Sequence, residues 1–327
     1  MRPRLLQRTA LMAALAAALA LASSPSRADV IANADMLRGI SISPEQCSSL
    51  PFSVWVARMG RGFCVRYYLS TAGGADVRPV VFLQGDRFGR LNLRTGEFER
   101  TDDKDVDTAQ LQKNAEFLSR QSKTTGIYLA RLGVDGSSGD HRARHTVLEL
   151  YAIDAALDAI KRKHGFEGFH LVGQSGGSLL VGGLLAQRQD IGCAVLGAGR
   201  LAAPGPLRRA NDAALEYYDV AHAIPTIAQR PARIVVITDP ADKKVPEGTQ
   251  TPFVNALREH GGKVEQLIVQ ATDDNRHSVA PYARLAMADC VRGAPPEELA
   301  RNVRQLVERR LTAKERAEQQ RASAVGE

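Results

Sequence analysis

Short, largely apolar runs recur along the chain and alternate with segments of helical periodicity. The apolar runs span 80–83, 127–130, 169–172, 193–196, 234–237 and 266–269. Runs of this kind, without a polar residue at every second position, are typical of parallel strands that are covered on both faces. The helical segments span 105–122, 146–163, 176–189, 252–260 and 281–291. This alternation predicts an α/β fold, in which a doubly wound, mostly parallel sheet lies between two layers of helices.

Two segments flank this alternation. Residues 52–56 and 63–69 are rich in β-branched and aromatic residues and surround a Met-Gly-Arg-Gly turn, which predicts a hairpin. Residues 297–320 are polar and rich in Arg and Glu, which predicts an exposed terminal helix. We therefore expect one α/β domain over 29–296, followed by a charged helix and tail over 297–327.

The net charge of +7 is unevenly distributed along a chain of ordinary globular composition, 44% hydrophobic and 24% charged, which excludes disorder as the main state. Residues 1–28 carry +4 and residues 301–327 carry +3, so the body between them is formally neutral. A neutral body offers no broad positive surface to the phosphates of a nucleic acid. Nucleic-acid binding is therefore not expected.

The first 28 residues have the order of a secretory signal peptide. Three arginines among the first eight residues precede the apolar run 10–22, and small residues follow that run. Cleavage after Ala22 and cleavage after Ala28 both satisfy the small-x-small rule. The alternative, a membrane anchor, is disfavoured because a spanning helix needs about 20 apolar residues. The prediction is a periplasmic or secreted protein without a stable membrane anchor.

The four cysteines are Cys47, Cys64, Cys193 and Cys290, an even set in a chain that is predicted to be exported. Three pairings are possible, and proximity in sequence favours Cys47–Cys64 together with Cys193–Cys290. The alternative for Cys193 is a buried thiol within an apolar run. No C-x-x-C pair is present, so a metal site is not expected, and nothing calls for a cofactor.

The segment Gly173-Gln174-Ser175-Gly176-Gly177 follows a predicted strand directly and opens a predicted helix. In that context the G-x-S-x-G pattern is typical of a nucleophile elbow, a tight turn that lifts a serine hydroxyl clear of the sheet. Gly-Ser turns are also common in proteins with no such role, but the position between strand and helix favours function. Ser175 is therefore the candidate nucleophile.

A serine nucleophile needs a base, and the elbow architecture predicts an acid and then a histidine later in the chain. Asp242 follows the apolar run 234–237, and His277 follows the run 266–269. Asp239 competes with Asp242, although an Asp at a strand end commonly caps a turn. We favour Asp242, which would orient His277 so that it accepts the proton of Ser175.

A tetrahedral oxyanion needs two backbone donors. We expect these to be the N–H of Gly176, directly after the nucleophile, and the N–H of Asp86, in the Gln84-Gly85-Asp86 turn after the first strand of the alternation. The alternative for that turn is an ordinary loop. His141 and His145 follow the strand that ends near residue 131, and they could either line the pocket or belong to a polar turn.

Residues 79–291 resemble the α/β-hydrolase superfamily in the motifs just described. The resemblance rests on Gly173–Gly177, on Asp242 with Val245-Pro246, on His277 and on Gln84-Gly85, which occur in the expected order. It implies a Ser-His-Asp triad on an α/β-hydrolase fold. Two positions depart from the pattern, because many members have His-Gly in place of Gln84-Gly85 and glycine in place of Asp239. The double glycine after Ser175 is also loosely similar to prolyl-oligopeptidase-like catalytic domains.

Three functional hypotheses follow, and the expected partner is a small-molecule or peptide substrate. The leading one is an exported serine hydrolase, an esterase above all, that cleaves a carboxylic ester or related acyl bond through an acyl-enzyme. Residues 200–229 are expected to form a short cap insertion, which favours a small or extended substrate. The second hypothesis is a serine peptidase, with Glu216 as a candidate for binding a substrate ammonium. The third, a non-catalytic binding protein, is disfavoured by the complete Ser, Asp and His set.

Overall fold

The computed structural model describes residues 30–92, 94, 95, 97–100, 104–202 and 211–325. The predicted signal peptide at 1–28 and residues 203–210 of the expected cap lie outside these residues. The main sheet contains β2 (Ser53–Arg58), β3 (Arg61–Ser70), β4 (Val80–Leu83), β8 (Gly126–Leu129), β9 (Phe169–Gln174), β10 (Ile191–Gly197), β11 (Arg233–Thr238) and β12 (Val264–Ile268).

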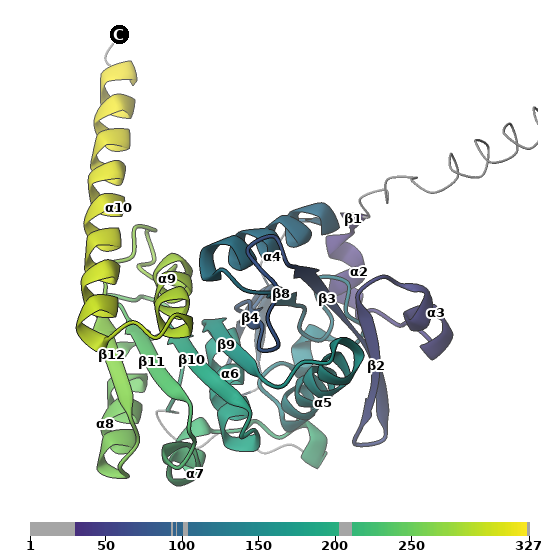
Figure 1. The fold of residues 1–327 in the computed structure, drawn as a ribbon. Coiled ribbons are helices and arrows are strands. Elements are labelled where there is room, and N and C mark those ends of the chain that lie inside the picture. The colour runs from purple at the N-terminus through teal and green to yellow at the C-terminus, as the bar shows by residue number, and fades with distance from the viewer. Residues whose placement is uncertain (1–29, 93, 96, 101–103, 203–210, 326–327) are drawn as a thin grey trace, which may run out of the picture.

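These eight strands lie in the order β12-β11-β10-β9-β4-β8-β3-β2 (Figure 1). The hairpin of β2 and β3 pairs antiparallel, as does β3 with β8, and every other neighbouring pair is parallel. Because the sheet is mostly parallel, its strand ends gather the loops that follow β4, β9, β11 and β12 along one edge. The predicted mostly parallel α/β sheet is confirmed.

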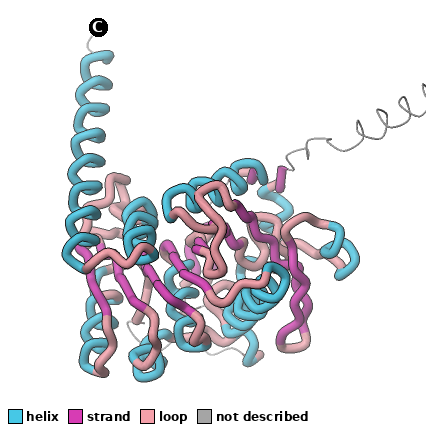
Figure 2. Tube along the Cα trace, viewed as in Figure 1, coloured by secondary structure: helices cyan, strands magenta, loops and turns pink. Residues whose placement is uncertain are grey.

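Helices cover both faces of the sheet (Figure 2). One hydrophobic cluster joins the sheet to α5 (Val147–His164), α6 (Gly176–Gln187), α7 (Ile224–Ala228) and α8 (Thr251–Glu259). A second cluster joins the other face to α4 (Thr108–Ser122), α9 (Ala280–Val291) and the first turns of α10 (Pro296–Val325). Beyond these turns α10 projects away from the body (Figure 1). None of the helices in the described ranges is long and apolar enough to cross a membrane.

The remaining short elements lie at the N-terminal side of the chain and in its loops. They are β1 (Val30–Ile31), α2 (Asn33–Arg38), α3 (Pro44–Ser49), β5 (Gly89–Leu91), β6 (Phe98–Arg100), β7 (Val106–Asp107) and 3-10 turns at His141–Ala143, Ala213–Leu215, Val220–Ala223 and Glu247–Thr249. Strand β1 pairs with β7, and β5 pairs with β6, so both of these small sheets are separate from the main one.

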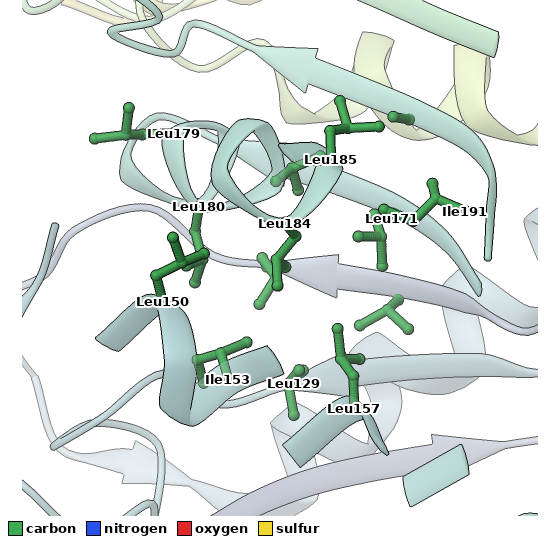
Figure 3. Packing of buried hydrophobic residues seen from close by; sticks show 14 of the residues in the cluster. Leu129, Leu150, Ile153, Leu157, Leu171, Leu179, Leu180, Leu184, Leu185 and Ile191 are labelled. Carbon is green, nitrogen blue, oxygen red and sulfur yellow. The ribbon is translucent and has the colours of Figure 1, made fainter. Parts of the chain in front are cut away.

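The periodicity of α5 explains how one face of the sheet is covered. Leu150, Ile153 and Leu157 fall at three- and four-residue spacing, and all three are buried. They belong to one cluster with leucines of α6 and with Leu129 and Leu171 of the sheet (Figure 3). The helix begins at a cap in which the Thr146 hydroxyl accepts the Glu149 N–H. This packing places the start of α6 firmly against the sheet.

Both favoured disulfides are present. Cys47 is joined to Cys64, which ties α3 to β3, and Cys193 is joined to Cys290, which ties β10 to α9. All four side chains are buried. The described residues contain no free cysteine.

Removing each disulfide should cost stability in proportion to the loop it closes. The Cys193–Cys290 loop spans 97 residues and the Cys47–Cys64 loop spans 17. Loop-closure entropy predicts a loss of about 5 kcal/mol in the free energy of unfolding for the Cys193→Ala/Cys290→Ala variant and about 3 kcal/mol for Cys47→Ala/Cys64→Ala. Urea denaturation followed by circular dichroism would measure both. Equal losses, or a larger loss for the shorter loop, would contradict the prediction.

A histidine at the beginning of β9 is held in its neutral form. The Nδ1 atom of His170 accepts the N–H of Cys193 at 3.0 Å, so it carries no proton. Burial and the nearby charge of Arg78 lower the pKa of His170 from 6.5 to about 4, against the opposing effect of Asp76. Because the pKa is lower in the folded state, the unfolded chain takes up the proton first as the pH falls.

The stabilisation by neutral His170 should therefore be complete above about pH 6.5 and decline as the pH falls toward 4. At pH 5 the loss amounts to about 2 kcal/mol. In His170→Asn the side-chain carbonyl replaces Nδ1 as the acceptor but does not titrate. The difference in unfolding free energy between pH 7 and pH 5, measured in urea, should be about 2 kcal/mol smaller in this variant than in the wild type. An unchanged difference would refute the assignment.

Candidate active site

Ser175 lies in a strained turn between β9 and α6. Its backbone has φ 54° and ψ −121°. This conformation is energetically unfavourable for any residue that has a Cβ, and residues held in such conformations are often found at functional sites. The Ser175 N–H donates to the carbonyl of Gly197 at the end of β10, 2.8 Å away. The turn predicted from the G-x-S-x-G pattern is present, and it follows a strand and opens a helix as expected.

Glycine is required on both sides of this serine because backbones approach closely there. A Cβ on Gly173 would lie 2.5 Å from the backbone of Gly177. A Cβ on Gly177 would overlap with the carbonyl oxygen of Leu83, the last residue of β4. The two glycines thus allow α6 to begin directly against the ends of β9 and β4.

The structure brings His277 and Asp242 together. The Nδ1 atom of His277 lies 2.8 Å from Oδ2 of Asp242, and the Asp242 side chain is fully buried. The other carboxylate oxygen, Oδ1, accepts the N–H groups of Lys244 and Val245 at 2.8 and 2.9 Å. The carboxylate is therefore fixed by its own loop, and one oxygen is left for the imidazole.

His277 is also tied to the turn that carries Ser175. The side-chain amide of Gln174 donates to the carbonyl oxygen of His277 at 2.8 Å. The imidazole is 13% exposed, so it lies at the surface of the site. Among the described residues no hydrogen bond joins the Ser175 hydroxyl to this imidazole; the connection runs through the residue before the serine.

Asp239, the competitor of Asp242, has different partners. It is completely buried, it forms an ion pair with Arg276 at 2.8 Å, and it accepts the N–H of Ala271. It also accepts the N–H of Ala241, which is the turn-capping role weighed from the sequence. Since Arg276 directly precedes His277, this ion pair anchors the loop that presents the histidine.

The loop after β4 lies against the serine. A Cβ on Gly85 would be 3.0 Å from Cβ and 3.7 Å from Oγ of Ser175. In the described part of the chain, the N–H groups of Gly176 and Asp86 donate to no protein acceptor. Within the described ranges, the two backbone donors predicted for an oxyanion are thus both unused.

A cluster of charged side chains, of which Arg131, Arg144 and Glu149 are buried, lies behind this loop. Asp86 accepts from Arg131 at 2.8 Å and lies 2.7 Å from Nε2 of His145, while Nε of Arg144 is 3.5 Å away. Arg131, in turn, is held by both carboxylate oxygens of Glu149 at 2.9 Å each. Burial opposes ionisation of Asp86, but the charges of His145, Arg131 and Arg144 outweigh it and hold the pKa of Asp86 well below its usual range.

His141 also contacts the loop after β4, through Arg87. Its Nδ1 lies 3.1 Å from the carbonyl of Leu132, and its Nε2 accepts the N–H of Arg87 at 3.3 Å. This arrangement needs a proton on Nδ1 and none on Nε2. Burial and the charges of Arg131 and Arg144 lower the pKa of His141 well below its usual value, which keeps it neutral. The residue is buried at the start of the 3-10 turn His141–Ala143.

Sequence reasoning missed Arg131 and Glu149, and it gave His145 no partner. One signal was available: Thr146-Val-Leu-Glu149 matches the pattern of a capping box at the start of a helix. That pattern predicts an exposed carboxylate that turns back to the helix end. Glu149 is instead fully buried and accepts the N–H of His145 at 2.8 Å together with the Arg131 guanidinium.

The fold has counterparts among solved structures. An esterase from Pyrococcus furiosus aligns at 14% identity with a TM-score of 0.52, over 78% of this chain and 96% of the esterase chain. Est1E from Butyrivibrio proteoclasticus, solved with ferulic acid, aligns at 11% identity with a TM-score of 0.48, over 73% and 96%. An acylaminoacyl peptidase from Pyrococcus horikoshii aligns at 15% identity with a TM-score of 0.49, over 77% of this chain and 39% of the peptidase, so this chain spans about two fifths of that protein. No protein-family model matches the chain, and no curated protein sequence matches it.

The chain has the α/β-hydrolase fold. Identity this low establishes the fold alone, because α/β-hydrolase proteins perform many different reactions. The activity therefore has to be argued from the site. Within the described ranges, no three His, Cys, Asp or Glu side chains gather as ligands of a metal ion.

On this α/β-hydrolase fold, the described part of the segment expected to be a cap is packed onto the body. Ala214, Val220, Ile224 and Ile227 are buried in the same core as α5 and α6. The carbonyl of Glu216 accepts the N–H at the start of α5.

Gly177→Ala should destabilise the protein because its methyl group would overlap with a backbone carbonyl that cannot move away. We expect a loss of about 3 kcal/mol in the free energy of unfolding, the upper part of the range for overpacking. Gly248→Ala is the matched control, since a Cβ there meets nothing within 4 Å, and it should change stability by less than about 0.5 kcal/mol. Chemical denaturation of both variants would test this, and similar stabilities would contradict the close approach.

Proposed function

We propose that this chain is an exported serine hydrolase that cleaves a carboxylic ester or related acyl bond through an acyl-enzyme. Ser175 is the nucleophile, His277 the general base and acid, and Asp242 the group that orients the histidine. The observation that carries the proposal is the 2.8 Å contact between His277 and a buried Asp242, with His277 tied through Gln174 to a strained serine turn.

The contact with Asp242 decides which nitrogen of His277 does the chemistry. An ionised carboxylate can only accept a hydrogen bond, so Nδ1 carries the proton and Nε2 has a free lone pair. Nε2 then takes the proton of the Ser175 hydroxyl as Oγ bonds to the substrate carbonyl carbon. The imidazolium that forms is stabilised by Asp242, which keeps its own negative charge.

The negative charge that develops on the carbonyl oxygen is received by the N–H groups of Gly176 and Asp86. Neither donor has to break a hydrogen bond within the described chain, so no reorganisation is needed as the charge appears. Collapse of the intermediate breaks the ester C–O bond, and His277 returns its proton to the leaving oxygen. Water then attacks the acyl-enzyme by the same route, releases the acid and restores Ser175.

Export forms part of the proposal. Both disulfides, Cys47–Cys64 and Cys193–Cys290, suit an oxidising compartment. Together with the signal-like order of residues 1–28, they support a periplasmic or secreted enzyme cleaved after Ala22 or Ala28. Residues 200–229 are proposed to border the substrate as a short insertion of the domain at 29–296.

A fluorophosphonate probe tests the serine chemistry. The wild-type protein should be labelled and should hydrolyse p-nitrophenyl esters, whereas Ser175→Ala and His277→Ala should lose labelling and at least about 10³-fold in kcat. Asp242→Asn should lose about 10²- to 10⁴-fold, because the amide favours the wrong tautomer.

Ser178→Ala is the matched control for this experiment. Ser178 is a buried serine one turn into α6, and its hydroxyl donates to the Gly197 carbonyl rather than to substrate, so labelling should persist. A wild-type protein that is neither labelled nor active on esters would sink the proposal and favour a non-catalytic role. Comparing p-nitrophenyl esters with aminoacyl-arylamides then separates an esterase, which prefers the esters, from a peptidase.

A further inference from the structure

The carboxylate of Asp86 touches the backbone of both proposed oxyanion donors. It is attached to one donor residue, and it packs against the other, because a Cβ on Gly176 would overlap with its Oδ1. The imidazole of His145 also packs against Gly176, since a Cβ on Gly176 would lie 2.8 Å from Cε1 of His145. A side chain in this place determines how far apart the N–H groups of residues 86 and 176 can lie.

The carboxylate is itself held in a closed ring of contacts. Oδ1 accepts from Arg131 at 2.8 Å, and Oδ2 lies 2.7 Å from Nε2 of His145. Both of these partners also donate hydrogen bonds to the Glu149 carboxylate. Arg131 donates through its guanidinium and His145 through its backbone N–H. Because Glu149 belongs to the first turn of α5, the ring ties the oxyanion loop to a rigid helix of the scaffold.

The sign of the charge makes this arrangement unexpected. A carboxylate beside an oxyanion would by itself repel the charge that forms in the transition state. The Asp86 carboxylate is 25% exposed, whereas Arg131 is 1% exposed and Arg144 is buried beside it. The guanidinium groups offset the charge of the carboxylate. What the Asp86 side chain then contributes to the site is the space that it occupies.

This inference rests on the proposed function. We propose that the Asp86 side chain is a positioning group that sets the spacing of the two oxyanion donors through its contacts with Arg131, His145 and the backbone of Gly176. It acts on the transition state and not on substrate binding. The Asp86 backbone N–H remains the donor, and every variant at this position keeps that N–H.

Asp86→Asn and Asp86→Ala measure the effect of the side chain alone. An asparagine keeps the shape but can accept from only one of its two partners, and alanine keeps neither. We expect kcat on a p-nitrophenyl ester to fall about 10-fold in the first variant and about 100-fold in the second, with KM within about threefold of the wild type. Affinity for a trifluoromethyl ketone, which forms an oxyanion on Ser175, should fall in parallel with kcat/KM.

Two outcomes would overturn the inference. A rise in kcat for Asp86→Asn would mean that the carboxylate acts only by its charge and opposes the reaction. An unchanged kcat per fluorophosphonate-titrated site, with only a lower melting temperature, would mean that it is merely structural. Arg188→Met is the matched control, because Arg188 is a comparably buried cation bound to Asp154, Asp158 and Asp190, and it should lower stability but leave kcat per titrated site unchanged.

Glu149→Gln keeps the test decisive if Asp86→Ala does not fold. Glu149 contacts neither donor, yet loss of its charge loosens Arg131, so kcat should fall about 10-fold with little change in KM. An unchanged kcat in both Asp86→Asn and Glu149→Gln would refute the inference. If the wild type reacts neither with the probe nor with esters, both the proposed function and the inference are refuted. If the wild type is active and the variants are fully active, only the inference is refuted.

Discussion

The close approach of α6 to the sheet is the constraint on which the site depends. The helix can begin at the ends of β9 and β4 only because residues 173, 176 and 177 have no side chain to fill that space. The approach forces Ser175 into its strained backbone conformation, and among the described residues it leaves the N–H of Gly176 without a protein acceptor. A rigid core of leucines from α5 and α6 compensates for that strain. The geometry of the Ser175 turn is thus a consequence of packing density.

Much of this architecture could be predicted from local patterns. Apolar runs of four residues indicated the strands, and three- and four-residue spacing indicated the helices, since both depend on which faces are buried. The choice of Asp242 over Asp239 also agrees with the contacts, since Asp242 reaches His277 and Asp239 pairs with Arg276. In both cases the decisive information lay within a few residues of a strand end.

The buried charges behind the oxyanion loop could not be predicted in the same way. Arg131, Glu149 and Asp86 come from three elements that are far apart in sequence, and each is ordinarily a surface residue. Burying Arg131 or Glu149 alone would be costly, so their burial depends on their meeting each other and the partly exposed Asp86. No sequence period encodes such a meeting, and the capping-box pattern at residue 149 pointed to the surface. Contacts of this kind emerge only once the strand order is known.

The link between Cys193 and Cys290 also determines what a proteolytic cut in the second half of the chain would separate. The ring that it closes contains Asp242 and His277, whereas Ser175 lies outside it, on the segment that precedes β10. Because β10 carries the carbonyl that holds the Ser175 N–H, a single cut anywhere in the ring would leave both fragments covalently joined beside the serine. After such a cut, Ser175, Asp242 and His277 would still belong to one covalently linked molecule.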